Sequence, residues 1–395
     1  MYRLHIDCNS YFASCEVATR PGTAGKPLVV ANDNEQGGGV ILALTPEAKA
    51  IGLKRGIPLF KVRDLLRREN VIICPADHKK YRRISHKIMS EVVAQGIVQD
   101  FVQYSVDEFF GTLPLDDPAE LRRYIAKVRN LITTTSGITV GCGCSQTNTL
   151  AKSATWFAKH YKAFDGICVL PPEKREQALA QLPLQEVWGV GRQAFRKLSA
   201  LGVVSALDFV HLPQRQVEQL LTTAGLHTYL ELQGIEATQL ESHDRRKSIM
   251  QSHTFATMIT SRDELSDEVA RFASRCAEQL RRQNSLCRTV TVFLNTNRYR
   301  DDLPQYRNDA VAKFDKPTAD TPAIATAAVG LLNSMFRPGY QYKRAGVVLS
   351  GIVDDKSCQL DLFNAEADER RRRLMAVTDI INSRFGDETV TFGNL

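Results

Sequence analysis

The sequence has no hydrophobic run that approaches the ~20 residues of a membrane-spanning helix. Its first residues lack the apolar stretch of a secretory signal peptide, so we expect a cytoplasmic protein without a membrane segment. The sequence also lacks a C-x-x-C motif, and its nine Cys are an odd number. The C-x-C at 142–144 has no His or Cys pair nearby to complete a zinc site, which favours buried, reduced thiols.

Acidic and basic residues are nearly balanced, with a small excess of basic ones. Lys and Arg number 51 against 44 Asp and Glu, which gives a net charge of +7 and a pI near 8.9. This excess favours a polyanionic partner, because Lys and Arg gain affinity by releasing phosphate counterions, but it does not identify nucleic acid. With 395 residues, 43% of them hydrophobic, the composition excludes a disordered tail protein and a coiled coil and predicts several globular modules.

The first 144 residues show the periodicity of a ferredoxin-like βαββαβ module. The expected order is a strand at 2–7, a helix at 79–94, strands at 101–106 and 109–113, a helix around 121–132 and a strand at 138–144. One long interruption, residues 19–76, follows the first strand. Because it is too long for a loop, we expect an inserted subdomain there.

The remainder of the chain predicts a helical region and then a second βαββαβ module. After a helix at 150–161, residues 172–237 have an all-helical pattern. The apolar pattern stops around 241–247, where Arg245, Arg246 and Lys247 face either a polyanion or water in an exposed linker. The strand and helix pattern returns over 252–352, and the chain ends in a polar tail.

Three carboxylates are candidates for a metal site. Asp7 ends a strand that is otherwise apolar, and Asp107 and Glu108 lie at the tip between two aromatic-rich strands. In a ferredoxin-like sheet these strands are neighbours, so the carboxylates should come together, and a cation would relieve their repulsion. This set suits paired Mg²⁺ ions that bridge substrate phosphates. Taken singly, either acidic position favours a solvated turn; together, in this topology, they favour a metal site.

Two further features suggest phosphate binding. Lys152 lies at the start of a predicted helix, where a cation opposes the helix dipole unless an anion sits there; a solvent-exposed Lys is the simpler alternative. The segment 187–198 resembles a helix-hairpin-helix, in which the Gly189-Val190-Gly191 turn, followed by Arg192, lets backbone N–H groups approach a DNA phosphate.

Four segments together resemble the Y family of translesion DNA polymerases, and within it the UmuC-type catalytic subunit of bacterial polymerase V. They are 7–16 (DCNSYFASCE), 104–109 (YSVDEF), 146–152 (QTNTLAK) and 187–191 (VWGVG). The likeness extends from residue 1 to about residue 395. It implies synthesis opposite damaged template in an SOS-type DNA damage response.

The resemblance implies a multidomain α+β fold: a ferredoxin-like palm with inserted fingers, an all-helical thumb with the helix-hairpin-helix, and a βαββαβ little finger. The expected boundaries are 1–18 and 77–166 for the palm, 19–76 for the fingers, 167–237 for the thumb, 238–249 for a linker, 250–353 for the little finger and 354–395 for a C-terminal tail.

The same resemblance implies roles for individual residues. Two Mg²⁺ ions would be held by Asp7, Asp107, Glu108 and the carbonyl of Cys8. Phe12 corresponds to the aromatic residue that excludes ribonucleotides and follows Tyr11. The nucleotide-binding set is Phe12, Tyr11, Lys49 and Lys152, and the DNA-binding set is Gly189, Gly191, Arg192, Arg245, Arg246 and Lys247.

The tail peptide 359–363 is similar to the peptide by which such polymerases hold the sliding clamp. Its clamp-binding residues would be Gln359, Leu360, Leu362 and Phe363. The resemblance also implies a processed UmuD dimer and RecA as partners, beside primer-template DNA and deoxynucleoside triphosphates. A loosely packed tail is the alternative interpretation of the peptide.

The chain departs from the family pattern in three places. Pro46 stands where many members have a Tyr that touches the triphosphate, Asn148 stands where a close relative has Lys, and the sequence stops soon after Gly393, where UmuC-type chains continue. Two other functions remain for comparison. A nucleotide cyclase shares the palm and its carboxylates but does not explain the hairpin, the second module or the clamp-like peptide. A non-catalytic polymerase-like accessory protein gives no reason for all three carboxylates.

Overall fold

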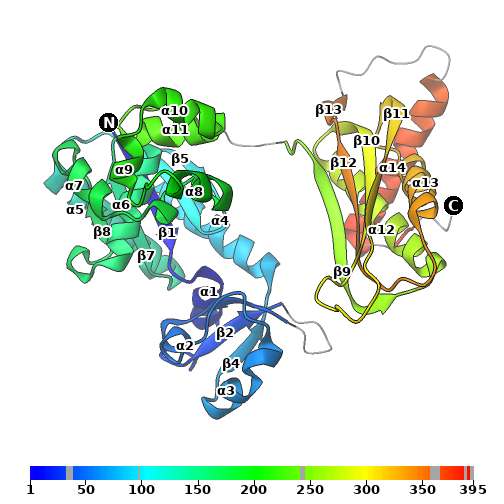
Figure 1. Cartoon of the computed structure of the whole chain (residues 1–395), viewed down its shortest axis with the longest axis horizontal. Coiled ribbons are helices and arrows are strands. Elements are labelled where there is room, and N and C mark those ends of the chain that lie inside the picture. Colours follow the sequence, from blue (N-terminus) through cyan, green and yellow to red (C-terminus); the bar gives the residue numbers. More distant parts are fainter. Residues whose placement is uncertain (33–38, 97, 241–244, 356–364, 387–388, 392–395) are drawn as a thin grey trace. The chain divides into compact units, whose positions relative to one another are not determined.

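The computed structural model describes the chain except for residues 33–38, 97, 241–244, 356–364, 387–388 and 392–395. The chain divides into two compact units, Met1–Ser242 and His243–Leu395 (Figure 1). The division falls within the segment 238–249, where the sequence predicts a linker. Across the described ranges, no helix is long and apolar enough to cross a membrane.

The first unit is built on a five-stranded sheet with the strand order β5-β6-β1-β7-β8. Its strands are β1 (Tyr2–Cys8), β5 (Gln99–Gln103), β6 (Glu108–Leu113), β7 (Val140–Ser145) and β8 (Ile167–Val169). The central strand β1 is antiparallel to both β6 and β7. The first four strands follow the βαββαβ prediction. β8 was not predicted, because three residues are too few to show a period of two.

Helices cover both faces of this sheet. They are α4 (His78–Ala94), α5 (Pro118–Ser136) and α6 (Asn148–His160). Because alternate residues of a strand point to opposite faces, Leu4 and Ile6 share a buried core with α4 and α5, whereas His5 on the other face contacts Thr155 of α6. The face of the sheet that carries His5 also carries Asp7.

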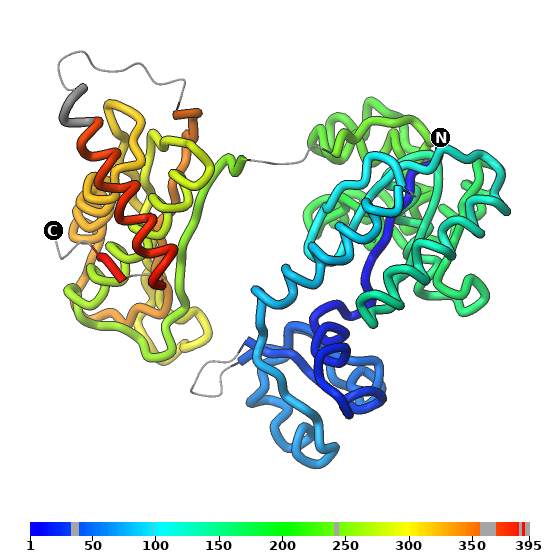
Figure 2. The backbone as a smooth tube through the Cα atoms, turned by 180° about the vertical axis from the view of Figure 1, so that it is seen from behind, coloured from blue at the N-terminus to red at the C-terminus, as the bar shows by residue number. Residues whose placement is uncertain are grey.

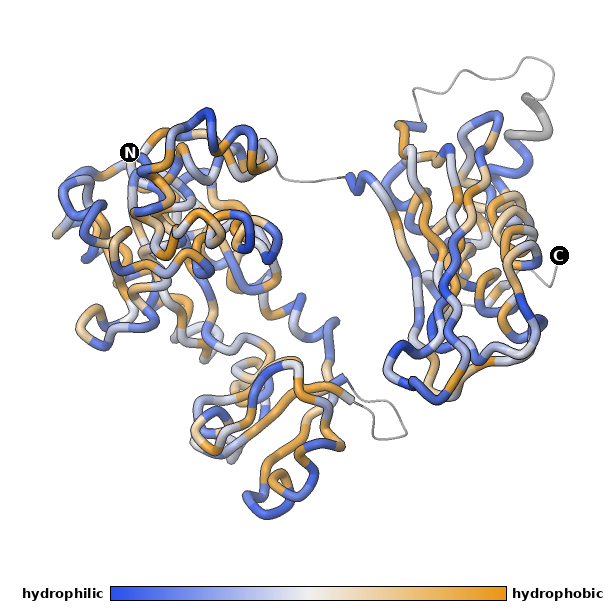
Figure 3. Tube along the Cα trace, viewed as in Figure 1, coloured by the Kyte–Doolittle hydropathy of each residue, from blue (hydrophilic) through white to orange (hydrophobic). Residues whose placement is uncertain are grey.

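The segment between β1 and α4 forms its own small sheet with the order β3-β2-β4. It follows α1 (Tyr11–Thr19) and contains β2 (Leu28–Ala31), β3 (Ile41–Leu44), α2 (Pro46–Ala50), η1 (Leu59–Val62), α3 (Arg63–Arg68) and β4 (Ile72–Pro75). A separate hydrophobic cluster that includes Val29, Ile41 and Leu66 lies under this sheet. Its strands form a mostly orange stretch of the tube in Figure 3.

A helical region completes the first unit. It contains η2 (Lys162–Phe164), η3 (Pro172–Lys174), α7 (Arg175–Gln181), η4 (Leu184–Glu186), α8 (Arg192–Ser199), α9 (Ala206–Val210), α10 (Gln214–Leu220) and α11 (Thr223–Leu232). These helices share a core with Leu150, Ala154 and Phe157 of α6. Helix α6 is therefore packed between the main sheet and the helical region.

The second unit repeats the element order βαββαβ with a different arrangement of strands. Its elements are β9 (Ile249–Ile259), α12 (Arg262–Arg282), β10 (Ser285–Thr296), β11 (Arg307–Thr318), α13 (Thr321–Met335) and β12 (Tyr342–Ser350). The strand order is β11-β10-β12-β9, so the second and fourth strands of the pattern are central. In the first unit the central strands are the first and third, β1 and β6. Periodicity identifies the elements but does not determine this order.

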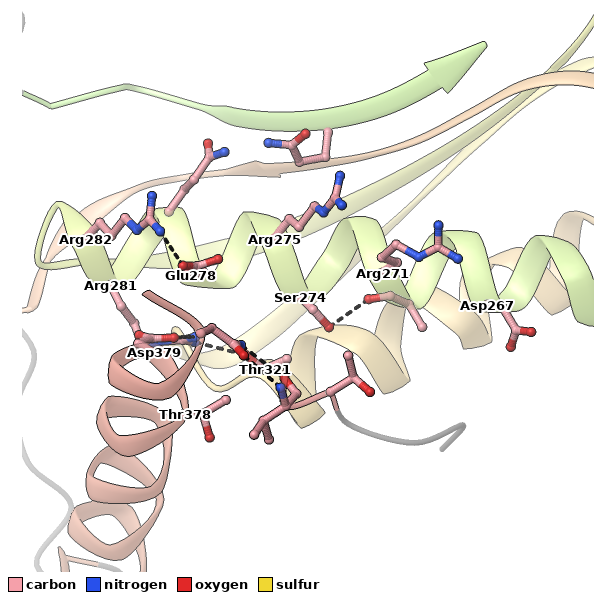
Figure 4. Close-up of a pocket in the computed structure, with 16 residues that line it drawn as sticks. Asp267, Arg271, Ser274, Arg275, Glu278, Arg281, Arg282, Thr321, Thr378 and Asp379 are labelled. Atoms are coloured by element: carbon pink, nitrogen blue, oxygen red, sulfur yellow. Dashed lines mark hydrogen bonds and ion pairs between the residues drawn. The ribbon is translucent and has the colours of Figure 1, made fainter. Parts of the chain in front are cut away.

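The predicted polar tail contains a helix, α14 (Ala365–Phe385), and a short strand, β13 (Val353–Asp354), that pairs with β10. The sequence predicts a polar tail but neither of these elements. Arg281 of α12 makes two hydrogen bonds of 2.7 Å to the carboxylate of Asp379, and a pocket of about 540 Å³ lies beside this pair (Figure 4). Figure 2 shows α14 in red along the outside of this unit. Only Met375 and Thr378 of its described side chains are buried, too few to mark a helix in the sequence.

The strand predicted at 101–106 is displaced. β5 ends at Gln103, and the backbone N–H groups of Tyr104 and Ser105 both donate to the carbonyl of Glu108, at 3.0 and 3.1 Å. Residues 104–107 therefore form the turn that leads into β6. The aromatic and β-branched residues of this segment favour a strand by propensity, but the turn hydrogen bonds determine its conformation.

Candidate active site

The two acidic segments meet at one end of the main sheet. Asp7 is the register partner of Glu108, and the backbone N–H of Cys8 donates to the carbonyl of Asp107 at 2.9 Å. Asp107 accepts a second hydrogen bond, from the hydroxyl of Ser105 at 2.6 Å. Residues separated by a hundred positions are thus joined by strand pairing at the carboxylates themselves.

Two lysines of α6 lie over these carboxylates. Nζ of Lys159 lies 2.5 Å from Oδ1 of Asp7, and Nζ of Lys152 lies 2.8 Å from Oε1 of Glu108. Sequence reasoning selected Lys152 and missed Lys159. The available signal was their spacing, because residues seven apart lie two turns along the same face of a helix.

The approach of α6 depends on glycine in β7. A Cβ on Gly143 would lie 2.1 Å from the backbone nitrogen of Thr155, and one on Gly141 would lie 2.7 Å from Cε of Lys159. Any larger residue at Gly143 would push the helix away from the sheet. The two glycines therefore bring the lysines to the carboxylates.

His5 is a second residue that the sequence interpretation missed. It is fully buried, its Nδ1 lies 2.8 Å from the hydroxyl of Thr155, and its Nε2 has no hydrogen-bond partner and lies 3.8 Å from Oε1 of Glu108. Burial, and then Lys152 and Lys159, hold the pKa of His5 well below its usual value. A neutral imidazole therefore lies beneath the carboxylates. Its position two residues before Asp7 on a strand indicates the same face.

The donor set at this site suits a hard divalent cation. In the described part of the chain, no group of three His, Cys, Asp or Glu side chains already surrounds a single point. The ammonium groups of Lys159 and Lys152 neutralise Asp7 and Glu108, so a metal ion would have to displace them. Burial, and then Asp7 and Asp107, raise the pKa of Cys8 well above its usual value, so its thiol stays neutral. The backbone oxygen of Cys8, rather than a thiolate, matches the carboxylate oxygens.

The two aromatic residues after β1 have different surroundings. Tyr11 is buried, and its hydroxyl donates to the carbonyl of Tyr81 at 2.7 Å. Phe12 is only partly buried and stacks on the ring of Tyr81 with a centroid distance of 4.5 Å. Tyr81 is itself held by Glu16, which accepts its hydroxyl at 2.7 Å. Of the two rings, only that of Phe12 can meet a ligand without unfolding its surroundings.

Lys49 lies beside the start of α1. Its Nζ lies 3.1 Å from the hydroxyl of Ser10, two residues before Phe12. Pro46 is the first residue of α2, a position where the missing N–H of proline costs nothing, and Thr45 caps the helix. Proline at position 46, where many family members have Tyr, therefore does not disrupt α2. Lys49 still reaches Ser10 at the N-terminus of α1.

The two glycines of the hairpin, Gly189 and Gly191, have different surroundings. Gly189 has φ +87°, and a Cβ there would lie 2.5 Å from Oγ1 of Thr228. A Cβ on Gly191 would meet nothing within 4 Å, and Arg192 begins α8 exposed to solvent. Gly189 is thus needed for the turn itself, whereas Gly191 leaves the backbone open to an approaching group.

The three predicted DNA-binding residues of the linker lie at the start of the second unit. Arg245 forms an ion pair with Asp354, the backbone N–H of Arg246 donates to Oε1 of Gln283 at 3.2 Å, and Lys247 is exposed. Asn148, the other departure, is buried, and its Oδ1 has no partner. The predicted clamp residues Gln359, Leu360, Leu362 and Phe363 lie outside the described residues.

Comparison with known proteins gives concordant matches along the chain. Residues 6–156 match the impB/mucB/samB family, and residues 246–362 match the C-terminal domain of that family. The chain is 32% identical to protein UmuC of Salmonella typhimurium over 98% of this chain and 92% of that protein. It is 27% identical to DNA polymerase IV of Desulfatibacillum aliphaticivorans over 98% of this chain and 95% of that protein. Among solved structures, a Y-family DNA polymerase chimera of Dbh and Dpo4 has a similar fold, with a TM-score of 0.72 and 21% identity over 90% of this chain and 100% of that chain.

Proposed function

The chain belongs to the impB/mucB/samB family, and from this premise we propose that Asp7, Asp107 and Glu108 form the metal-dependent centre of a template-directed polymerase. The protein is a Y-family DNA-directed DNA polymerase of the translesion type, with a role in the DNA damage response. The observation that carries the proposal is the register pairing of Asp7 with Glu108 beneath two lysines.

Two Mg²⁺ ions held by the three carboxylates and the carbonyl of Cys8 would neutralise the phosphates of substrate and leaving group. The chain's own residues would prepare that charge arrangement. Lys152 and Lys159 neutralise Glu108 and Asp7, and with metal ions on these carboxylates both ammonium groups would be available to phosphate oxygens. Lys49, at the start of α1, would supply a third cation for the triphosphate.

Phe12 would select the sugar. Its partly buried ring stacks on Tyr81. A 2′-hydroxyl placed against the Phe12 ring would therefore collide with it, because the ring cannot move away. Tyr11, assigned with it to nucleotide binding, would act by supporting α1, because its hydroxyl is already used by the backbone of Tyr81.

DNA contacts would come from both units. The open backbone at Gly191, with Gly189 and Arg192, suits a DNA phosphate. Arg246 and Lys247 are exposed cations at the start of the second unit, whereas Arg245 would first have to release Asp354. The division of the chain into palm, fingers, thumb, little finger and tail at the predicted boundaries belongs to the same proposal, as does a cytoplasmic location.

The proposal is tested by primer extension on a template with an abasic site. We expect the chain to insert deoxynucleotides opposite the lesion when a divalent metal is present. Adding a processed UmuD dimer and RecA, the partners that the family resemblance implies, should increase that insertion. DNA binding without extension under every condition would instead favour a non-catalytic accessory protein.

A sliding clamp is a further proposed partner. Leu362 and Phe363 are adjacent apolar residues in a polar segment, a composition suited to docking on another protein. Replacing both with Ala should remove clamp-stimulated synthesis and leave extension on short templates unchanged. The measurement is the ratio of product lengths with and without clamp, and equal stimulation of the double variant would contradict the assignment.

A further inference from the structure

Lys152 lies among aromatic rings as well as beside a carboxylate. Its Nζ lies 5.4 Å from the ring centroid of Tyr104 and 5.3 Å from that of Trp188, in addition to the 2.8 Å contact with Glu108. The two rings are perpendicular, with centroids 5.5 Å apart. An ammonium group within about 6 Å of an aromatic face is attracted by the quadrupole of the ring, most strongly for Trp. Lys152 therefore has two kinds of partner, one anionic and one aromatic.

The indole of Trp188 is held in place from two sides. It stacks on Phe110 of β6 with a centroid distance of 5.7 Å and an interplanar angle of 30°. The carbonyl of Trp188 accepts a hydrogen bond of 3.2 Å from the hydroxyl of Thr228 on α11, and Gly189 follows with its positive φ. The helical region thus fixes the backbone of Trp188 and the sheet fixes its ring.

The two kinds of partner would separate when metal binds. A divalent ion on Glu108 would compete with the ammonium group of Lys152 for the same carboxylate oxygens, and it would carry the higher charge. The rings do not neutralise the ammonium charge. An ammonium group that has lost Glu108 but still faces Trp188 and Tyr104 stays in the site with its charge available to an anion.

We propose that Trp188 is a positioning residue that, together with Tyr104, retains Lys152 in the active site for a phosphate oxygen of the incoming nucleotide once metal has taken Glu108. This inference rests on the proposed polymerase function. It adds an aromatic support, supplied by the helical region, to a lysine that the sheet and α6 already position. Trp188 directly precedes the Gly189–Gly191 turn, so the segment proposed to contact DNA also positions this lysine.

The test compares three proteins: the full chain, Trp188→Phe and Trp188→Leu. Both substitutions keep an apolar side chain against Phe110, but only Phe retains an aromatic face. Trp188→Leu should raise the KM for the nucleotide ~3- to 30-fold with a smaller change in kcat, and Trp188→Phe should stay within about 3-fold of the unsubstituted chain. Tyr104→Leu, at an exposed position, should raise KM in the same direction, and it keeps the test available if Trp188→Leu fails to fold.

A double-mutant cycle separates this role from packing. In a Lys152→Met background the ammonium group is absent, so Trp188→Leu should change KM by less than about 2-fold. Tyr124→Leu is the control and should leave KM unchanged, because it removes a ring that faces a different lysine, Lys127 on α5, at 5.8 Å. Equal KM values for Trp188→Phe and Trp188→Leu, or an undiminished effect without Lys152, would overturn the inference. Absence of any extension by the unsubstituted chain would instead refute the proposed function.

Discussion

At the residue scale, the site is a set of charges that neutralise one another before any ligand binds. Asp7 and Glu108 are paired with Lys159 and Lys152, and neutral His5 lies beneath them. Without those lysines, adjacent carboxylates at the edge of an apolar sheet would repel each other and lose hydration. The same lysines that neutralise these carboxylates are the ones that we propose contact phosphates.

Phe12 provides a residue-scale prediction about sugar selection. Truncation to Ala should remove the steric penalty against a 2′-hydroxyl, typically ~1–3 kcal/mol, and so raise the ribonucleotide to deoxynucleotide insertion ratio roughly 5- to 150-fold. Tyr11→Phe is the matched control, since it removes only the hydroxyl that donates to Tyr81. The ratio is measured by single-nucleotide insertion. An unchanged insertion ratio in Phe12→Ala would mean that Phe12 is only a core aromatic residue. A higher ratio in Tyr11→Phe would assign sugar selection to Tyr11 instead.

At the scale of elements, the position of α6 determines the site. This helix carries both lysines and Thr155, and it lies close to the sheet because β7 has glycine at Gly141 and Gly143. Its other side packs in the core of the helical region. A shift of α6 would therefore separate the lysines from the carboxylates while leaving β1 and β6 paired.

Gly143→Ala tests this dependence. The added methyl would overlap the backbone of α6, so we expect the variant to lose about 1–3 kcal/mol in the free energy of unfolding and most of its extension activity. The control in the same unit is Gly191→Ala, where the methyl meets nothing within 4 Å; its free energy of unfolding should stay within about 0.5 kcal/mol. The free energies are measured by urea unfolding, and the activity of Gly143→Ala by primer extension. If Gly143→Ala were as stable as Gly191→Ala and as active as the unsubstituted chain, glycine at Gly143 would not be what sets the helix position.

The Arg281–Asp379 pair joins α14 to α12. Arg281 also donates to the carbonyl of Ala319 at 2.7 Å and to the hydroxyl of Thr321 at 3.0 Å, so the guanidinium is anchored on the second unit and Asp379 completes its shell (Figure 4). Asp379→Ala should destabilise the second unit by about 1–3 kcal/mol. This is measured as a shift of its urea midpoint in the full chain.

The comparison variant is Asp302→Ala, which removes an exposed ion pair with Arg300. Solvent and salt screen such a pair, so no measurable shift is expected. Should Asp379→Ala also leave the midpoint unchanged, the Arg281–Asp379 pair would contribute nothing to the stability of the unit.

At the scale of the whole molecule, sequence reasoning was most successful where distant segments are joined by topology. The βαββαβ order of the first module makes its first and third strands neighbours, which predicted Asp7 beside Glu108 across a hundred residues, and the structure has this pairing. Lys159 was missed because its one signal, the seven-residue spacing from Lys152, does not show how closely α6 approaches the strand that carries Asp7. The strand order of the second sheet and helix α14 also depend on tertiary contacts that periodicity does not record.

The central claim is that Asp7, Asp107 and Glu108 bind the metal ions of a polymerase, and it is tested most directly by measuring Mg²⁺-dependent primer extension and primer-template affinity in the same variants. Asp107→Ala and Glu108→Ala should each reduce extension at least about 100-fold and leave DNA affinity largely intact, because phosphate contacts elsewhere carry binding. Asp116→Ala, beyond the opposite end of β6, should extend primers normally. Extension by Asp107→Ala or Glu108→Ala at the rate of the unsubstituted chain would contradict the account.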